Sequence, residues 1–438
     1  MNNQVPTRIA GILLGALKGG VVPRVGLEYI TVGRAQEIAA ILHDIDMVAD
    51  GGASFRFIVG KYGSGKSFLL QTIRNYATAK GFAVVDADLS PERRFAGTKG
   101  QGLATYKELL HNLSTKSKPD GGALPLILEK WISGIRASVK SQTGLDGESL
   151  DIEAEKQIYA VAGSLEGMVN GFEFAKAVAT YWRAYRHDDS ATKSNVLRWF
   201  RGEYATRREA KADLDINFIV TDETWYDFLK ILAAFLVGAG YKGLLVLIDE
   251  LVNIFKIPNS ITRQNNYEKI LTIYNDVLQG KARHIGFLMG GTPQCIEDKY
   301  KGVFSYEALR SRLAEGHFAT DDIKDLTAPI IRLQMLTQEE MYVLVEKLRD
   351  IHAGLYNYAP ALSHQDLLYF LTVEYNRVGA GTHITPREVI RDFIELTGIL
   401  HQNPRKSVEE ILGSNSFEMA KGGLSDEDIH ADFKEFEI

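Results

Sequence analysis

The residues best suited to chemistry lie in the stretch from Gly60 to Ser67, which reads GKYGSGKS. The stretch matches G-x-x-x-x-G-K-[ST] at every fixed position, the pattern of a loop that binds nucleotide phosphates. Its glycines let backbone N–H groups close around phosphate oxygens, and the helix that follows presents its positive dipole end to them. We expect Lys66 to reach the β- and γ-phosphates and the Ser67 hydroxyl to ligate Mg²⁺. The residues expected to contact the nucleotide are Gly60, Tyr62, Gly63, Ser64, Gly65, Lys66, Ser67 and Phe68.

A second pair of candidate residues, Asp249 and Glu250, follows the apolar run at positions 244–248. Such a run predicts a buried parallel strand, and ligands bind at the carboxyl ends of parallel strands. We expect Asp249 to hold Mg²⁺ through water and Glu250 to polarise the attacking water as a general base. An acidic pair after an apolar run is common by chance. Together with the phosphate-loop motif it predicts hydrolysis of ATP, with both residues converging on Lys66.

Two further positions have two interpretations each. Thr292 ends the apolar run at 283–292, where its hydroxyl would either hold the attacking water or sense the γ-phosphate. Thr292 and Pro293 would equally well form a helix cap. Gly33 and Arg34 would either contact the nucleotide or open a helix that packs on the core. The spacing of the residues leaves both pairs of interpretations open.

The elements that must position these residues are apolar runs alternating with helical patterns. The run at 55–59 leads into the phosphate loop, and an amphipathic helical pattern at 68–73 follows it. Further buried strands are expected at 82–87, 244–248, 283–292 and 330–333. Asp86 and Asp88, near the end of the second run, would face the phosphate side. This alternation predicts an α/β fold around a parallel sheet.

The remaining chain predicts helices outside this core. Residues 97–220 show helical periodicity without a buried-strand run, and from Thr337 a capping box opens a series of helices. Pro386 stands at the first position of one of them. We therefore expect an N-terminal segment at 1–50, a core at 51–96 and 221–335, a helical insertion at 97–220, a helical lid at 336–402 and a polar, acidic tail at 403–438. The tail fits either disorder or a docking peptide.

The insertion contains a basic and aromatic stretch between Tyr181 and Lys211. Its basic residues are Arg183, Arg186, Lys193, Arg198, Arg201, Arg207, Arg208 and Lys211. Its interleaved aromatic residues are Tyr181, Trp182, Tyr185, Trp199, Phe200 and Tyr204. Positive charge with stacking faces is typical of nucleic-acid binding. An amphipathic helix pair with an arginine-rich solvent face has the same composition, so both interpretations stay open.

Composition excludes several classes of protein. The 438 residues are 45% hydrophobic and 24% charged, which is ordinary for a globular chain of two or three domains. The net charge of −6 gives no global signal for nucleic acid. The single cysteine, Cys295, excludes an internal disulfide framework and fits a reducing cytosol. Because no run approaches the roughly 18 apolar residues of a membrane span, we expect a cytoplasmic protein without a membrane partner.

Taken together, the motifs resemble those of AAA+ ATPases of the initiator and loader clade, a type of P-loop NTPase. In that clade a segment like Leu309-Arg310-Ser311-Arg312-Leu313 contains the arginine finger, which implies Arg312, with Arg310 as the fallback. The resemblance implies that Arg387, after Thr385-Pro386, is the sensor-two arginine and that Val32-Gly33-Arg34 lies on the adenine side. It also implies a homo-oligomer in which Arg312 completes a neighbour's site. No N-K-x-D motif is present, which argues against GTP.

A finer resemblance runs from Met1 to about Gln402. The chain is similar to the ATP-binding proteins of bacterial BREX phage-defence systems, of the smaller BrxD-like kind, through its Val22-Pro23-x-x-Gly26-Leu27 and Asp88-x-Ser90-Pro91-Glu92-Arg93-Arg94 segments. The resemblance implies ATP and Mg²⁺ as cofactors and a motor, loader or switch in an antiphage complex, acting on DNA beside a helicase-like partner. A nucleotide-gated scaffold with negligible turnover is the alternative. A small-molecule kinase is the weaker third reading, because no dedicated substrate motif is present.

Overall fold

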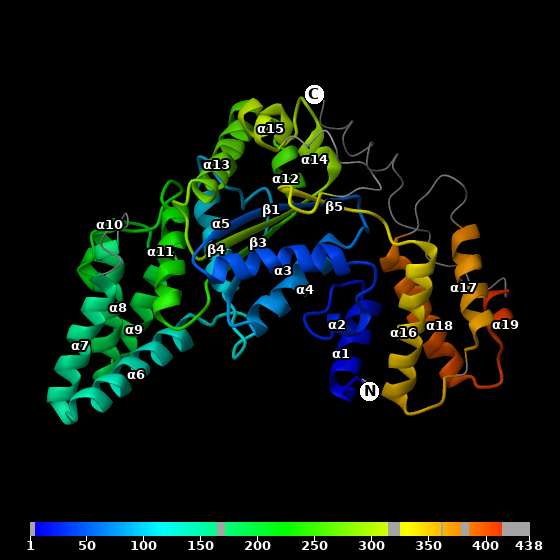
Figure 1. Ribbon diagram of the computed structural model, residues 1–438, viewed down its shortest axis with the longest axis horizontal. Helices are drawn as coiled ribbons and strands as arrows, with labels where there is room; N and C mark the ends of the chain where they lie inside the picture. Colours follow the sequence, from blue (N-terminus) through cyan, green and yellow to red (C-terminus); the bar gives the residue numbers. More distant parts are fainter. Residues whose placement is uncertain (1–4, 164–170, 314–324, 361, 378–384, 414–438) are drawn as a thin grey trace. The chain divides into compact units, whose positions relative to one another are not determined.

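The computed structural model describes residues 5–163, 171–313, 325–360, 362–377 and 385–413 (Figure 1). The chain divides into two compact units. The first contains residues 1–35, 60–72 and 333–438, and the second contains residues 36–59 and 73–332. The phosphate-loop motif therefore belongs to the same unit as the C-terminal helices, whereas most of every strand belongs to the second unit.

The second unit is built on a five-stranded sheet with the order β2-β3-β4-β1-β5. Its strands are β1 (Ala53–Gly60), β2 (Ala83–Asp88), β3 (Leu244–Asp249), β4 (Ile285–Gly291) and β5 (Ile330–Leu333). The strands run parallel, as in the register that pairs Val246 with both Val85 and Phe287. Their carboxyl ends therefore share one edge of the sheet.

The strands form where the sequence has continuous apolar runs. All seven residues of β4 are buried, as are seven of the eight residues of β1. A strand buried on both faces needs apolar residues at successive positions rather than alternate ones, which is the pattern of a covered parallel sheet. The predicted α/β fold with a parallel sheet core is confirmed.

One helix of this unit is fixed to the sheet by a buried ion pair. Asp44, on α3 (Ala35–Ala49), accepts hydrogen bonds of 2.6 and 2.8 Å from the Arg56 guanidinium on β1. Arg56 also donates to the carbonyls of Thr327 and Ala328, just before β5. The pair therefore joins α3, the central part of β1 and the approach to the edge strand β5. Other helices near the sheet are α5 (Gln101–His111), α11 (Trp225–Gly238), α12 (Val252–Phe255), α13 (Ser260–Leu278), α14 (Pro293–Glu297), the 3₁₀ turn η1 (Val303–Ser305) and α15 (Glu307–Leu313).

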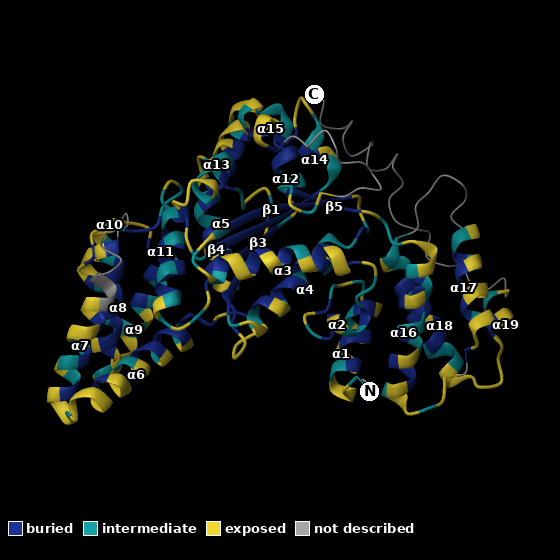
Figure 2. Cartoon of the chain, viewed as in Figure 1, coloured by how far each residue is buried: buried dark blue, intermediate teal, exposed yellow. Residues whose placement is uncertain are grey.

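The chain between β2 and β3 is helical where the structure describes it. Beyond α5, it forms α6 (Leu124–Thr143), α7 (Gly147–Gly163), α8 (Gly171–Arg186), α9 (Ser190–Phe200) and α10 (Arg207–Leu214) before α11. Consecutive helices from α6 to α10 pack against each other, with their outer faces exposed (Figure 2). Phe174 of α8 contacts Phe200 of α9 and Phe228 of α11, with ring centroids 5.0 and 6.1 Å apart. Large aromatic side chains thus form the core that ties these helices to α11.

The first unit is a bundle of helices around the phosphate loop. It comprises α1 (Thr7–Lys18), α2 (Leu27–Ile30), the start of α4 (Lys66–Ala79), α16 (Gln338–Tyr356), α17 (His364–Arg377), α18 (Pro386–Gln402) and α19 (Val408–Leu412). α1 packs against both α16 and α18 through buried residues such as Leu13, Val345 and Phe393. The predicted capping box at Thr337 is present, with Glu340 as its partner. A second capping box, Thr385 with Glu388, opens α18.

None of the described helices combines the length and the apolar character that crossing a membrane requires.

Candidate nucleotide-binding site

The phosphate loop has the backbone that its glycines predict. Gly63 and Gly65 have φ angles of 80° and 85°, in the left-handed region that side chains disfavour, and α4 begins at Lys66. A Cβ on Gly60 would collide with the Ser64 hydroxyl and lie 3.1 Å from Leu333 Cβ. The Lys66 Nζ donates to the carbonyls of Gly60 and Lys61 at 2.8 and 2.9 Å. These features fit a phosphate group, because a short glycine-rich turn and a helix N-terminus meet next to a lysine.

Arg34 supports the phosphate loop through a hydrogen bond to its backbone. Its side chain is buried, with 6% of the residue exposed, and it donates to the Ser64 carbonyl at 3.0 Å. It also donates to the carbonyl of Gln334 at 2.6 Å, in the connection between β5 and α16. The arginine predicted on the adenine side therefore bonds to the backbone of the loop itself. The bond between positions 34 and 64 joins segments whose proximity the sequence pattern does not reveal.

Gly33 lies against the first turn of α16. Its φ angle is 67°, and a Cβ at this position would collide with the carboxylate of Glu340. That carboxylate accepts a hydrogen bond from the Thr337 N–H in the capping box. Gly33 is therefore required by a turn and by a close approach. A contact between Gly33 and the nucleotide stays a prediction.

The predicted sensor-two arginine lies beside the loop within the first unit. Arg387 Nη1 donates to the Tyr62 hydroxyl at 3.1 Å, and its guanidinium lies over the Tyr62 ring, 5.9 Å from the centroid. A Cβ on Gly63 would lie only 2.8 Å from Thr385 Cγ2, so the N-cap of α18 packs directly on the loop. The start of α18 is thus in contact with the predicted phosphate-binding residues. Phe68, by contrast, packs against the hydrophobic core of this unit.

The second unit places three carboxylates at the carboxyl ends of neighbouring strands. Asp88 of β2 is in register with Asp249 of β3, and Glu250 follows directly. Glu250 has a φ angle of 62°, and its N–H donates to Asp249 Oδ1 at 2.8 Å. A left-handed backbone at a glutamate is strained, and residues strained in this way cluster at functional sites. Partial burial, followed by the charges of Asp249 and Glu250, raises the pKa of Asp88 to about 6.

The two acidic residues near the end of β2 have different neighbours in the structure. Asp86 pairs with Arg74 of α4 at 3.2 Å, whereas Asp88 faces Asp249. Period-two alternation alone would place both on one face of the strand. Of the two residues expected on the phosphate side, Asp88 therefore lies beside Asp249 at this edge, whereas Asp86 is paired with Arg74. Among the described residues, no group of His, Cys, Asp or Glu is arranged to hold a metal ion unaided. Mg²⁺ normally takes further ligands from nucleotide phosphates and water, and its binding here stays a prediction.

Thr292 is a helix cap. Its hydroxyl accepts from the Cys295 N–H at 3.3 Å and opens α14, with Pro293 in the first turn. The capping interpretation is therefore realised in the structure. A role toward the attacking water stays a prediction.

The two candidate finger arginines lie on the exposed side of α15. Arg310 pairs with Glu307 at 3.7 Å, and Arg312 Nη1 donates to the Ala308 carbonyl at 2.7 Å. Both bonds stay within one short helix and involve exposed side chains, so they are weak. Glu315, three residues after Arg312, would be an alternative ion-pair partner but lies outside the described residues. The finger role of Arg312 stays a prediction.

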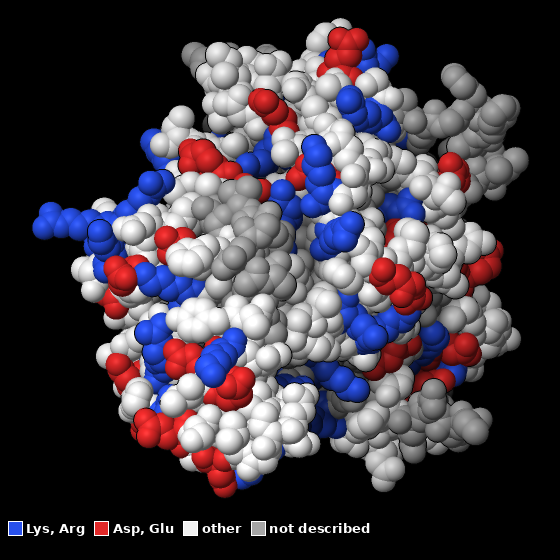
Figure 3. Space-filling model, turned by 60° about the vertical axis from the view of Figure 1, so that its left-hand side comes forward, with Lys and Arg blue, Asp and Glu red and all other residues white. Residues whose placement is uncertain are grey.

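The basic and aromatic stretch of the helical region buries most of its rings. Tyr181, Trp182, Trp199, Phe200 and Tyr204 are all at most 2% exposed, which leaves Tyr185 as the exposed ring of that set. Several basic side chains pair with acidic ones, such as Arg186 with Asp151 and Arg198 with Glu209. On the face shown in Figure 3, basic and acidic side chains are interspersed. The stretch therefore has the character of amphipathic helices, and five of its six rings are not available for stacking.

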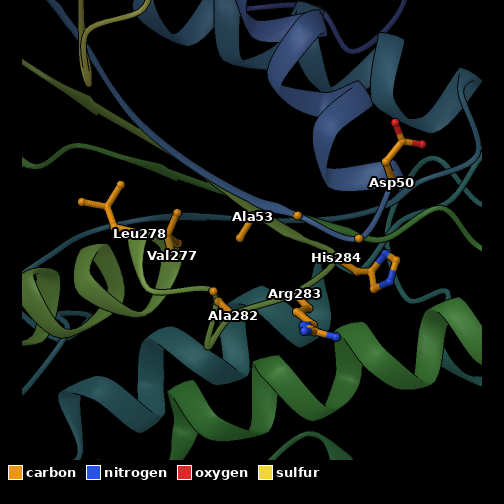
Figure 4. A pocket seen from close by; sticks show the side chains of 10 residues that line it. Asp50, Ala53, Val277, Leu278, Ala282, Arg283 and His284 are labelled. Carbon is orange, nitrogen blue, oxygen red and sulfur yellow. The ribbon is translucent and has the colours of Figure 1, made fainter.

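A hollow of about 610 Å³ lies at the opposite edge of the sheet, where β1 and β4 begin (Figure 4). It is lined by Asp50, Gly51, Gly52, Ala53, Val277, Leu278, Gly280, Ala282, Arg283 and His284. None of the predicted site residues is among them. The hollow is thus separate from the carboxyl edge at which the predicted chemistry lies.

Comparison with known proteins identifies the family of the chain. A model of the protein family described as BREX system ATP-binding protein BrxC/D matches residues 5–416. A search of curated proteins found no match. The chain therefore belongs to the BrxC/D family of BREX system ATP-binding proteins, which supports an ATP-binding role in phage defence.

Proposed function

We propose that this chain hydrolyses the ATP that it binds and uses the cycle to drive a conformational step, as a motor, loader or switch in a BREX complex. The observation that carries the proposal is the loop between β1 and α4, with two left-handed glycines and a helix that starts at Lys66. Its backbone N–H groups and the helix dipole favour bound phosphate. The carboxylates after β3 add the groups that hydrolysis requires.

Each residue has a separate role in the proposal. Lys66 binds the β- and γ-phosphates, and Ser67 and Asp249 hold Mg²⁺, the latter through water. Bound Mg²⁺ supplies charge that stabilises the developing phosphate charge. Glu250 accepts the proton of the attacking water. Its backbone N–H donates to Asp249 Oδ1, which restrains the orientation of the Asp249 carboxylate.

Two arginines of the first unit have different tasks in this proposal. Arg34 supports the loop, because its buried guanidinium donates to the Ser64 and Gln334 carbonyls. Arg387 binds the γ-phosphate after leaving Tyr62, to which it is now joined by a single hydrogen bond and a ring contact. A weak and exposed contact is suited to exchange.

The test uses Lys66→Ala and Glu250→Gln, with Lys61→Ala as the matched control because it removes the same charge from the same loop. Lys66→Ala should abolish tight ATP binding, since a charge-assisted phosphate contact is lost. Glu250→Gln should bind ATP normally and hydrolyse it about 10²- to 10⁴-fold more slowly. Calorimetry measures binding and phosphate release measures turnover.

Two outcomes would contradict the proposal. Unchanged ATP binding by Lys66→Ala would show that the loop is not the phosphate site. Negligible turnover by the wild-type protein, with ATP binding intact and with or without DNA present, would favour a nucleotide-gated scaffold instead.

We further propose that Arg312 completes the site of a neighbouring copy. An arginine stays charged, and its planar fork fits phosphate oxygens; fingers of this kind are worth roughly 10³- to 10⁵-fold in turnover. Mixing Arg312→Ala with Lys66→Ala subunits should restore part of the ATPase activity, because some interfaces then combine an intact loop with an intact finger. Activity should also rise faster than linearly with protein concentration. Strictly linear activity without rescue would make Arg312 a structural residue.

We also propose that the complex acts on DNA beside a helicase-like partner. The family's role in phage defence supports this proposal, and so do the exposed basic side chains of α10, Arg207, Arg208 and Lys211. Steady-state ATPase activity with and without DNA tests it. No change of rate or affinity on adding DNA would confine the action of this chain to protein partners.

A further inference from the structure

The turn from Asp298 to Gly302, between α14 and η1, has hydrogen bonds to most of its backbone positions. The Asp298 carboxylate accepts from the N–H groups of Tyr300 and Lys301 at 2.7 and 2.8 Å. The Gly302 N–H donates to the Asp298 carbonyl at 3.0 Å, and the Tyr267 hydroxyl donates to the Lys301 carbonyl at 2.6 Å. A Cβ on Gly302 would lie 2.7 Å from that Asp298 carbonyl oxygen, so only glycine fits. The turn is therefore held in one conformation.

Three consecutive side chains of this turn, those of Lys299, Tyr300 and Lys301, are exposed to solvent. Tyr300 is 87% exposed, the largest value among the exposed large hydrophobic side chains of the described chain, and Lys299 and Lys301 beside it are also exposed. No hydrogen bond or ion pair joins these three side chains to other described residues. A single exposed tyrosine needs no explanation. Here, however, the tyrosine lies between two exposed lysines on a turn whose backbone is held by hydrogen bonds. The three side chains therefore form one contact surface.

The surroundings of the turn are basic rather than acidic. η1 packs against both α14 and α15, and α15 exposes Arg310 and Arg312. Glu307, the acidic residue of α15, pairs with Arg310, and Glu297 of α14 pairs with Arg332. The Asp298 carboxylate is occupied by the backbone of the turn. Among the described residues, Lys299, Lys301 and Arg312 therefore make the charge of this surface positive.

We propose that the turn from Asp298 to Gly302 binds single-stranded nucleic acid, with the Tyr300 ring stacked on a base and Lys299 and Lys301 on the flanking phosphates. Stacking on an aromatic ring combined with backbone charge is how proteins bind single strands. Lysine is depleted from the cores of protein interfaces, which disfavours a protein partner here. The turn follows β4 through α14, on the carboxyl side of the sheet. The inference rests on the proposed action on nucleic acid and not on ATP hydrolysis.

The experiment measures binding of fluorescein-labelled oligothymidine to the full chain by anisotropy over a range of salt. Tyr300→Ser should weaken binding by about 5- to 150-fold, the value of one stacked base, whereas Tyr300→Phe should retain it. Lys299→Gln with Lys301→Gln should reduce the salt slope by about 1.4, at about 0.7 per phosphate contact. Affinity for a duplex of equal length should not respond to Tyr300→Ser, because its bases are stacked on each other.

The matched control is Tyr185→Ser, which removes a tyrosine that is 38% exposed on α8. It should leave binding unchanged, and all variants should keep the basal ATPase rate measured without DNA, which shows that they fold. Loss of binding by Tyr185→Ser but not by Tyr300→Ser would overturn the inference in favour of the helical region. Equal losses for single strand and duplex would exclude stacking. A wild-type protein that hydrolyses ATP but binds no single strand would overturn this inference and leave the ATPase proposal intact.

Discussion

Replacing Arg34 by lysine tests what supports the phosphate loop. The substitution keeps the positive charge but removes the planar fork, so one ammonium must serve carbonyls that now bond to a guanidinium. The bonds at risk are those to Ser64 O at 3.0 Å and to Gln334 O at 2.6 Å. Because Arg34 is buried, water does not replace these bonds freely. The loop should therefore lose a restraint while the fold survives.

The size of the effect follows from the bond to Ser64. A hydrogen bond that involves a charged group contributes about 1.5 to 3 kcal/mol. If ordering the loop costs that amount at the moment of binding, the affinity for ATP falls by about 10- to 150-fold. The loss should be the same for inorganic tripolyphosphate, because the loop binds phosphates and the defect lies in the loop.

The assay is calorimetric titration of Arg34→Lys with ATP and, separately, with tripolyphosphate. Arg8→Lys is the matched control, since Arg8 is exposed on α1 of the same unit. A variant that binds ATP more weakly but tripolyphosphate normally would refute the reasoning. That result would make Arg34 a contact of the adenine or ribose, as its place in the sequence first indicated.

Three further perturbations follow from the structure. Tyr62→Phe removes the hydroxyl that accepts from Arg387. Because Arg387 is then freer to bind the γ-phosphate, ATP binding should tighten slightly and ADP binding should not change. Equally weakened binding of both nucleotides would instead make Tyr62 a direct nucleotide contact. Burial is the largest cause that lowers the pKa of His352 from 6.5 to about 4. As pH falls below 6.5, His352 therefore binds a proton in the unfolded chain before it does so in the folded chain, and the free energy of unfolding decreases. In urea unfolding the loss should reach about 1.4 kcal/mol near about pH 5.5 and vanish in His352→Gln; a pH-independent wild type would contradict this. Asp44→Leu leaves the buried Arg56 without its partner and should lower the free energy of unfolding by about 3 to 5 kcal/mol. The double variant with Arg56→Met should recover most of this loss. Equal losses in the single and double variants would argue against a charge effect.

The sheet could be predicted from the sequence because burial on both faces leaves a continuous apolar run. The runs ending at Val59 and Ile248 each became a strand, and the residue after each one, Gly60 or Asp249, lies at the carboxyl end. The glycine loop was predictable for a similar reason. Left-handed φ angles at Gly63 and Gly65 restrict those positions to very few residue types, so the requirement is visible in the sequence itself.

Contacts between distant segments could not be predicted in this way. Nothing in the local pattern at Arg34 indicates that its guanidinium bonds to a carbonyl 30 positions further along. The aromatic residues between Tyr181 and Tyr204 have a clear local pattern, but that pattern fits two structures. Interleaved basic and aromatic residues arise both on a binding face and on amphipathic helices, and only the packing of Phe174 against Phe200 shows that the rings point inward. The exposure of Tyr300 could not be predicted, because a lone tyrosine in a polar turn has no periodicity.

The close approach of Gly63 and Thr385 brings the phosphate loop into direct contact with the start of α18. Coupling between two parts of a protein requires an element whose equilibrium both parts can bias. Here a Cβ would not fit between the two residues, so a shift of the loop toward α18 at Gly63 must displace the N-cap or the capping box that Thr385 forms with Glu388. Loss of a cap costs about 1 kcal/mol, which is small beside the binding energy of a nucleotide. Closure of the loop on phosphate is therefore strong enough to displace the start of α18, and Arg387, the second residue of that helix, moves with it.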